Sequence, residues 1–244
     1  MSVLLIVLIV VGLAVAAALW NLSELGSRRN PNIQPICVQC GNPLPAVTWI
    51  PFYGVLTAWR CRSCGTRQPK SRFVWEFAVG SYFGVIGWKW DDAHSLLFAV
   101  AAAIPLLLIL IIDLRGHVLY LNSIVLALAV AAVLGFLDGP RGLGSAMIGL
   151  IGGIAISAAF FALSRWVFRS LSLRVSNIGI GDVYIAAAVG AIVRGDGIVP
   201  AFAFAVIFTL LGSVLLPIFS KSARHRATAY GTYLCLGGLL TLIR

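Results

Sequence analysis

Long apolar runs separated by short polar stretches dominate the chain. A helix that crosses the hydrocarbon core of a membrane needs about 20 mostly apolar residues. The pattern therefore predicts an all-α polytopic membrane protein with about eight transmembrane helices. The sixth and eighth runs are short for spanning. The eight apolar runs are Val3–Trp20, Phe73–Trp88, Leu96–Ile112, Val118–Leu137, Leu143–Leu163, Val183–Val193, Ile198–Phe219 and Tyr230–Ile243.

One long polar insertion, residues 21–72, interrupts this pattern. It divides the chain into a first transmembrane helix at residues 1–20, a small polar module at 21–72 and a seven-helix membrane domain at 73–244. No basic residues precede the first apolar run, and no clear small-residue cleavage motif follows it. We therefore expect a retained helix rather than a signal peptide.

The chain is strongly basic, with 18 Lys and Arg against 8 Asp and Glu and a net charge of +10. Such an excess can indicate nucleic-acid binding, but the distribution of the basic residues indicates membrane topology instead. If the polar insertion is cytoplasmic, 14 of the 18 lie on the cytoplasmic side, which matches the positive-inside rule. We therefore predict an external N-terminus, attraction to anionic membrane lipids and no nucleic-acid partner. The four basic residues on the outer side are Lys89, Arg141, Arg194 and Arg244.

Four cysteines in the polar insertion form two Cys-x-x-Cys pairs, Cys37 with Cys40 and Cys61 with Cys64. Two such pairs separated by 20 residues predict a tetrahedral four-thiolate zinc site. Four thiolates leave no open coordination position, so the expected role of the zinc is structural. Two disulfides or four free thiols are the alternatives, and a reducing cytoplasm disfavours disulfides. The fifth cysteine, Cys235, is expected to be a small buried apolar residue.

Two carboxylates lie at ends of apolar runs, where burial makes a charge costly and therefore suggests function. Asp113 ends an inward-running helix, and Asp182 begins an outward-running one after the turn Gly179-Ile180-Gly181, so both are expected at one depth near the cytoplasmic face. Two carboxyls at one depth can share a proton and activate water. The alternative for each is an interfacial carboxylate, paired with Arg115 in the case of Asp113.

With these features together, the chain resembles the type IV prepilin peptidases, which are GxGD-type aspartyl proteases of the membrane. The resemblance covers most of the chain. It rests on the cysteine insertion with Ile50-Pro51, the segment from Arg72 to Glu76, Asp113-Leu114-Arg115, and Gly179 to Val183 with Gly190 downstream. It implies that Asp113 and Asp182 are the catalytic pair, with Gly179, Gly181 and Glu76 as substrate-binding or turn residues.

The resemblance implies cleavage of the basic leader of type IV prepilins or pseudopilins, after a glycine, at the cytoplasmic face of a bacterial inner membrane. It also implies methylation of the new N-terminus by S-adenosylmethionine, for which the sequence shows no separate methyl-donor motif. The family signature after the first span is only loosely matched, by Asn21 and Arg28. Three other positions depart from the family pattern: Leu119-Tyr120 replaces Ile-Pro, Tyr184 replaces Lys, and Ala229 to Tyr233 replaces a Pro-Phe-Gly-Pro type run.

Two functions from other classes remain open on the sequence. In a catalytically silent membrane scaffold, the zinc module would dock a partner and the two aspartates would be interfacial anchors that need not meet. In a proton-coupled transporter, the paired acids would carry protons and would be expected near the middle of the bilayer.

Overall fold

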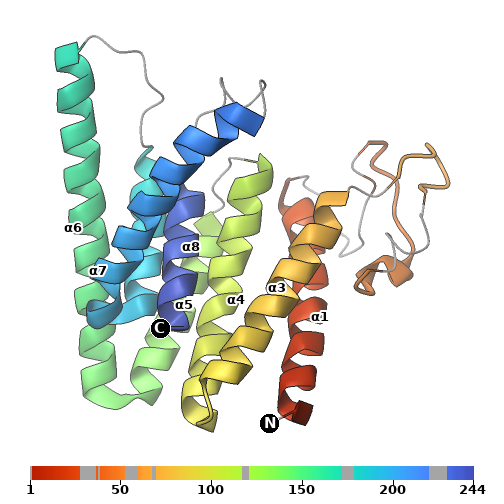
Figure 1. The fold of residues 1–244 in the computed structure, drawn as a ribbon, viewed down its shortest axis with the longest axis horizontal. Coiled ribbons are helices and arrows are strands. Elements are labelled where there is room, and N and C mark those ends of the chain that lie inside the picture. The colour runs from red at the N-terminus through yellow and green to blue at the C-terminus, as the bar shows by residue number, and fades with distance from the viewer. Residues whose placement is uncertain are drawn as a thin grey trace. The chain divides into compact units, whose positions relative to one another are not determined.

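The computed structural model describes residues 2–27, 37, 39–52, 60–67, 70–116, 121–171, 179–219 and 230–244 (Figure 1). Within these residues the secondary structure is helical, apart from turns, irregular segments and isolated bridges such as that between Arg60 and Arg67. The all-α prediction is therefore confirmed for the described part of the chain. The elements are α1 (Ser2–Ser27), the 3-10 turn η1 (Ala46–Trp49), α3 (Lys70–Lys89), α4 (Ala93–Gly116), α5 (Leu121–Leu137), α6 (Gly139–Leu171), α7 (Ile180–Phe219) and α8 (Tyr230–Leu242).

Four of the described helices are long and apolar enough to cross a membrane. The helices α5 and α8 are also apolar but shorter, and α3 contains four charged residues, so none of these three is among the four. The chain thus has the helices of a membrane protein, and eight spans remain a prediction. The four candidate spans are Val3–Ser23, Ala93–Arg115, Gly139–Leu163 and Ile180–Gly212.

The chain forms two compact units, Met1–Val100 and Ala101–Arg244. In the first unit, α1 packs along α3, and the contact is close because glycines face large side chains across it. Gly12 lies against Phe83, and Gly80 lies against Leu13. The indole Nε1 of Trp75 donates a hydrogen bond of 3.2 Å to the backbone oxygen of Ala16, so the two helices are also joined by a polar contact.

In the second unit, α6 and α7 approach until their backbones touch. A Cβ atom on Gly149 would overlap the carbonyl oxygen of Gly190, and one on Gly190 would overlap that of Gly149. One turn further along α6, Gly153 faces the carbonyl oxygen of Ala186 in the same way. Small residues permit this approach between membrane helices. Gly149 and Gly153 therefore serve the packing of α6 against α7.

We expect Gly190→Leu to disrupt the packing of α6 against α7, because the new side chain would meet backbone that cannot move aside. Overpacking of this kind costs about 1–3 kcal/mol, and more where backbone is displaced. Thermal unfolding in detergent should show a lower Tm, together with less monodisperse protein. Gly144→Leu is the matched control, since no atom lies within 4 Å of a Cβ built there. Equal Tm values for the two variants would contradict the close contact.

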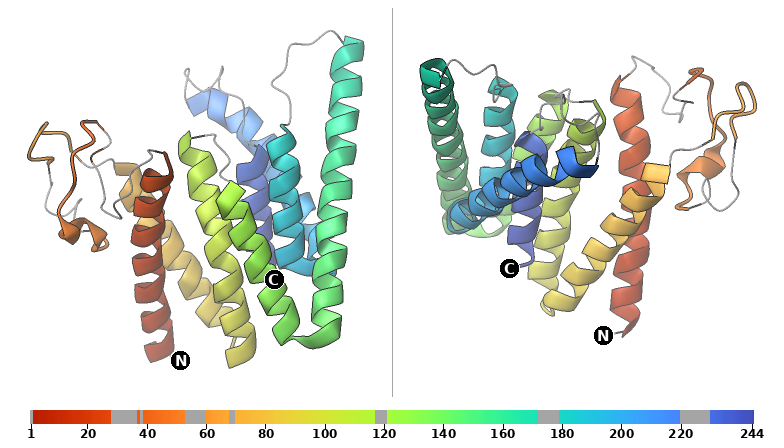
Figure 2. Two further views of the ribbon diagram at one scale, coloured as in Figure 1. Left: turned by 180° about the vertical axis from the view of Figure 1, so that it is seen from behind. Right: turned by 45° about the horizontal axis from the view of Figure 1, so that its top comes forward.

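Helix α7 is interrupted at Arg194, whose backbone has φ 66° and ψ −179°. The chain reverses there, and the two halves of α7 run in opposite directions (Figure 2). The break falls between the sixth and seventh apolar runs of the sequence. Arg194 pairs with the carboxylate of Asp138 and donates to the backbone oxygen of Leu134 at 3.3 Å, which holds this uncommon conformation in place.

Candidate functional site

The two aspartates of the second unit converge on the backbone of Gly231, at the start of α8. Asp113 lies in the last turn of α4, and Asp182 lies in the first turn of α7. The amide of Gly231 donates to Oδ1 of Asp182 at 3.1 Å. A Cβ atom built on Gly231 would lie 3.3 Å from Oδ2 of Asp113 and 3.3 Å from Oδ1 of Asp182. These two carboxylate oxygens are therefore separated by no more than twice that distance.

Asp182 closes the glycine turn that precedes it. The amide of Gly179 donates to Oδ2 of Asp182 at 2.8 Å, and the amide of Asp182 donates to the backbone oxygen of Gly179 at 3.0 Å. Both oxygens of this carboxylate thus accept hydrogen bonds from backbone N–H groups, one from the turn and one from Gly231. Gly179 therefore closes the turn that places Asp182, and Gly181 lies half-buried in the first turn of α7. The substrate-binding or turn roles that the resemblance implied for both glycines stay a prediction.

Asp113 is held by a side chain of α8. The hydroxyl of Thr232 donates to Oδ2 of Asp113 at 2.6 Å, and Thr232 itself is buried. This hydroxyl is therefore one partner of Asp113, supplied by a helix far away in the sequence.

The start of α8 is the part of this site that sequence reasoning missed. Gly231 and Thr232 each contact one aspartate, and Tyr230 lies directly before them. In the sequence these residues stood out only as a departure from a family pattern. The available signal was a glycine and a threonine at the beginning of an apolar helix. These residues offer hydrogen-bond donors to the acids that lie at the end of α4 and the start of α7.

Glu76 lies in the first unit, and its environment is that of a structural ion pair. Its carboxylate is fully buried and accepts a hydrogen bond of 2.7 Å from Nε of Arg72, one turn earlier on α3. It also accepts the backbone amide of Phe52 at 2.7 Å, while Arg72 donates to the backbone oxygen of Thr48. Glu76 thus faces the interior of the unit and joins the segment around η1 to α3.

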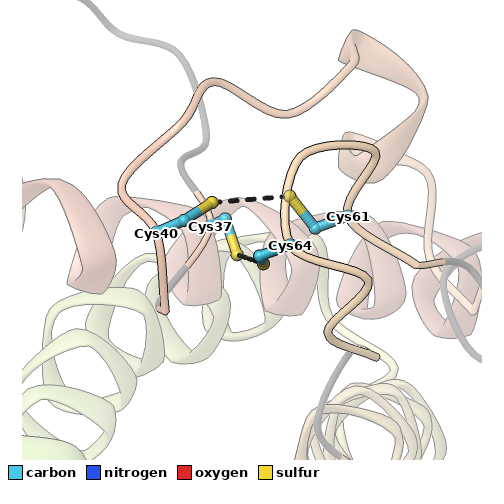
Figure 3. A group of neighbouring side chains, drawn as sticks. All are labelled: Cys37, Cys40, Cys61 and Cys64. Carbon is cyan, nitrogen blue, oxygen red and sulfur yellow. Dashed lines mark hydrogen bonds between the residues drawn. The ribbon is translucent and has the colours of Figure 1, made fainter.

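The four cysteines of the polar insertion gather in one cluster, drawn in Figure 3. All four Sγ atoms lie within 4.8 Å of one another. The distance is 3.6 Å both between Cys37 and Cys64 and between Cys40 and Cys61. Zinc–sulfur bonds of about 2.3 Å in a tetrahedron place sulfurs about 3.8 Å apart. The cluster therefore fits a four-thiolate zinc ion, and all five cysteines of the chain are free of disulfides.

Each cysteine pair folds as the same small loop. In the first loop, the amide of Cys37 bonds to the backbone oxygen of Asn42 and the amide of Gly41 bonds to that of Cys37, both at 2.8 Å. In the second loop, Cys61, Thr66 and Gly65 repeat these bonds at 2.9 and 2.8 Å. Gly41 and Gly65 have φ of 73° and 71°, a conformation that glycine adopts without strain. The glycine after each Cys-x-x-Cys pair is thus what lets the loop turn its two sulfurs inward.

The electrostatics of the cluster favour some thiolates and oppose others. Hydrogen bonds from the side chain and backbone of Thr66 lower the pKa of Cys64 to about 6. A backbone hydrogen bond at Asn42 lowers the pKa of Cys40, but partial desolvation and hydrogen bonds with the three neighbouring sulfurs outweigh it and raise the pKa to about 12. Four thiolates at this spacing repel one another, and a divalent cation among them would remove that repulsion.

Comparison of the chain with protein-family models, with curated proteins and with solved structures gives no match. Some residues that depart from the prepilin peptidase pattern can be located in the structure. Tyr184, where that pattern has Lys, is exposed near the start of α7. Tyr120 and Arg28 lie outside the described residues. The two aspartates and the cysteine cluster are the features of the described residues that bear on function.

Proposed function

We propose that the chain is a membrane aspartyl endopeptidase that uses Asp113 and Asp182 as its catalytic pair. The observation that carries the proposal is the convergence of these two carboxylates, from α4 and α7, on Gly231 of α8. Bringing two acids together in an apolar bundle costs free energy, which a silent scaffold has no reason to expend. Both acids lie at helix ends rather than at mid-helix, which disfavours the transporter alternative.

The hydrogen bonds suggest how the two acids divide the work. Both oxygens of Asp182 accept from amides, which can only donate, so Asp182 suits the ionised base. The hydroxyl beside Asp113 can donate or accept, so Asp113 can carry the shared proton. The helix dipoles act in the same sense, because Asp182 begins its helix and Asp113 ends its own.

In the proposed reaction, Asp182 takes a proton from a water molecule as the water oxygen attacks the scissile carbonyl carbon. Asp113 gives its proton to the carbonyl oxygen, which yields a tetrahedral diol. Collapse of the diol breaks the carbon–nitrogen bond. The proton held by Asp182 passes to the leaving amine, and Asp113 recovers its own from the diol.

The finer assignment follows the resemblance described above. The substrate would be a type IV prepilin or pseudopilin, cut after a glycine between a short basic leader and an apolar segment. Cleavage would occur at the cytoplasmic face of a bacterial inner membrane, with the zinc module on the same side. Methylation of the new N-terminus by S-adenosylmethionine rests on the resemblance alone.

The experiment that tests the function is incubation of the purified protein with a peptide that carries a basic leader, a glycine and an apolar segment. Mass spectrometry should find cleavage directly after the glycine. The same reaction with S-adenosylmethionine should add one methyl group if the second activity is present. Absence of cleavage of this peptide and of authentic prepilins would reject the proposal in favour of a scaffold.

The proposed orientation predicts a labelling pattern in intact cells. Asn30→Cys in the polar insertion should not react with a membrane-impermeant maleimide. Arg141→Cys, on the predicted outer side of the membrane, should react. The native cysteines serve as an internal control, because the exposed Cys40 and Cys64 should label only after the cells are opened. Labelling of Asn30→Cys from outside would reverse the orientation.

A further inference from the structure

Tyr230 brings a buried hydroxyl without a partner to the aspartate site. It is the first residue of α8, directly before Gly231 and Thr232, which hold Asp182 and Asp113. Tyr230 is only 7% exposed. Its hydroxyl oxygen is buried and has no hydrogen-bond partner among the described residues. A buried polar group in this position destabilises the free protein unless a partner arrives.

The chemistry of the surroundings indicates what kind of partner is missing. Tyr230 directly precedes Gly231, whose amide bonds to Asp182, yet no hydrogen bond joins the phenol to that carboxylate. The oxygens of Asp182 already accept two amides, and Oδ2 of Asp113 accepts Thr232. The phenol is therefore a free donor beside the acids. Its natural complement is a neutral acceptor that enters with the substrate.

We propose that the hydroxyl of Tyr230 donates a hydrogen bond to a backbone carbonyl oxygen of the peptide that lies against Asp113 and Asp182. This inference rests on the proposed function and deepens it, since it adds a substrate-binding residue to the catalytic pair. Every peptide substrate has such an oxygen, so the contact recognises the main chain and not a particular side chain. The buried hydroxyl costs stability in the free protein, and the substrate provides the compensating bond.

The proposal predicts that stability and activity change in opposite directions when the hydroxyl is removed. A structural hydroxyl is already bonded, so its loss lowers the Tm. An unpaired hydroxyl that awaits a substrate leaves the Tm unchanged or higher when it is lost. The same change removes one hydrogen bond from the substrate complex, which corresponds to a fall of about tenfold to a hundredfold in kcat/KM.

The test is Tyr230→Phe, which keeps the ring and deletes the oxygen. Because the ring that fills this buried position is kept, the variant should fold. Expected results are a Tm no lower than that of the unaltered protein and the stated fall in kcat/KM on the leader peptide. Tyr233→Phe is the matched control on the same helix, since Tyr233 is partly exposed and its hydroxyl lies beside Gly212 of α7. Its kcat/KM should not change.

Two further outcomes separate this inference from the proposed function. If the unaltered protein cleaves the peptide and Tyr230→Phe cleaves it with the same kcat/KM, the hydroxyl does not bind substrate and this inference alone is overturned. If the unaltered protein neither cleaves the peptide nor binds an analogue with a hydroxyl in place of the scissile carbonyl, both the function and the inference are overturned. A lowered Tm with unchanged kcat/KM would assign the hydroxyl a structural role, which also overturns the inference.

Discussion

Replacement of either catalytic aspartate, Asp113→Asn or Asp182→Asn, is expected to lower peptide cleavage by at least about 10³-fold. An amide cannot take a proton from water, and it cannot supply one to a developing oxyanion. Because the two acids act on one water and one carbonyl, loss of either should cost nearly as much as loss of both. The measurement is the initial rate of cleavage of the leader peptide by each single variant, compared with the rate of the double variant.

The control for this result is Asp196→Asn, an exposed aspartate of α7 in the same unit that contacts neither acid. It should cleave at the unaltered rate. All variants should insert into membranes and retain zinc, which separates loss of chemistry from loss of fold. Activity against pH should be bell-shaped, because the reaction needs one proton on the pair, and the two limbs belong to the pair as a whole. Substantial cleavage by a well-folded single variant would reject the catalytic pair.

Loss of zinc is expected to unfold the cysteine module while the membrane helices stay intact. We predict one zinc ion per chain, held by Cys37, Cys40, Cys61 and Cys64. Among the described residues of the module, the buried apolar cluster consists of two of its own cysteines and Leu44, so metal binding would supply much of the folding free energy. Cys61→Ser should therefore abolish zinc binding and expose residues 37–67 to proteases.

The matched control is Cys235→Ala, because Cys235 is fully buried in α8 and is not one of the four cluster residues. Its zinc content should stay at one per chain. Elemental analysis and limited proteolysis provide the measurements. Freshly purified protein without zinc, or with disulfides between these cysteines, would contradict the metal site. Cys61→Ser should retain measurable cleavage, since no step of the proposed chemistry passes through the metal.

The helices could be predicted from the sequence because each depends on a local property, the apolar character of consecutive residues. The break at Arg194 falls between two runs for the same reason, since the polar segment around Asp196 and Gly197 separates them. The pairing of helices could not be predicted. The contact of α6 with α7 depends on which faces carry Gly149 and Gly190, and every helix in an apolar bundle offers several such faces.

In the candidate sites, too, local features could be predicted from the sequence and contacts between distant residues could not. The cysteine cluster could be predicted because each Cys-x-x-Cys pair is a local loop and the two loops have a familiar separation. The meeting of the two aspartates could be expected, because the predicted topology put both at one depth. Thr232 could not be assigned to Asp113, since 119 residues separate the two in the chain and no local pattern connects them. The fully buried state of Glu76 likewise depends on Arg72 and on the distant Phe52 amide.

The two cysteines of each loop differ in their access to solvent. Cys37 and Cys61, the first of each pair, are buried, whereas Cys40 and Cys64 are exposed. We therefore expect chelators and oxidants to react first with Cys40 and Cys64, while Cys37 and Cys61 remain bound to the ion. Exchange of the metal should proceed stepwise through intermediates with two protein ligands. The rate of zinc loss should accordingly rise with the concentration of the chelator instead of being set by spontaneous opening of the module.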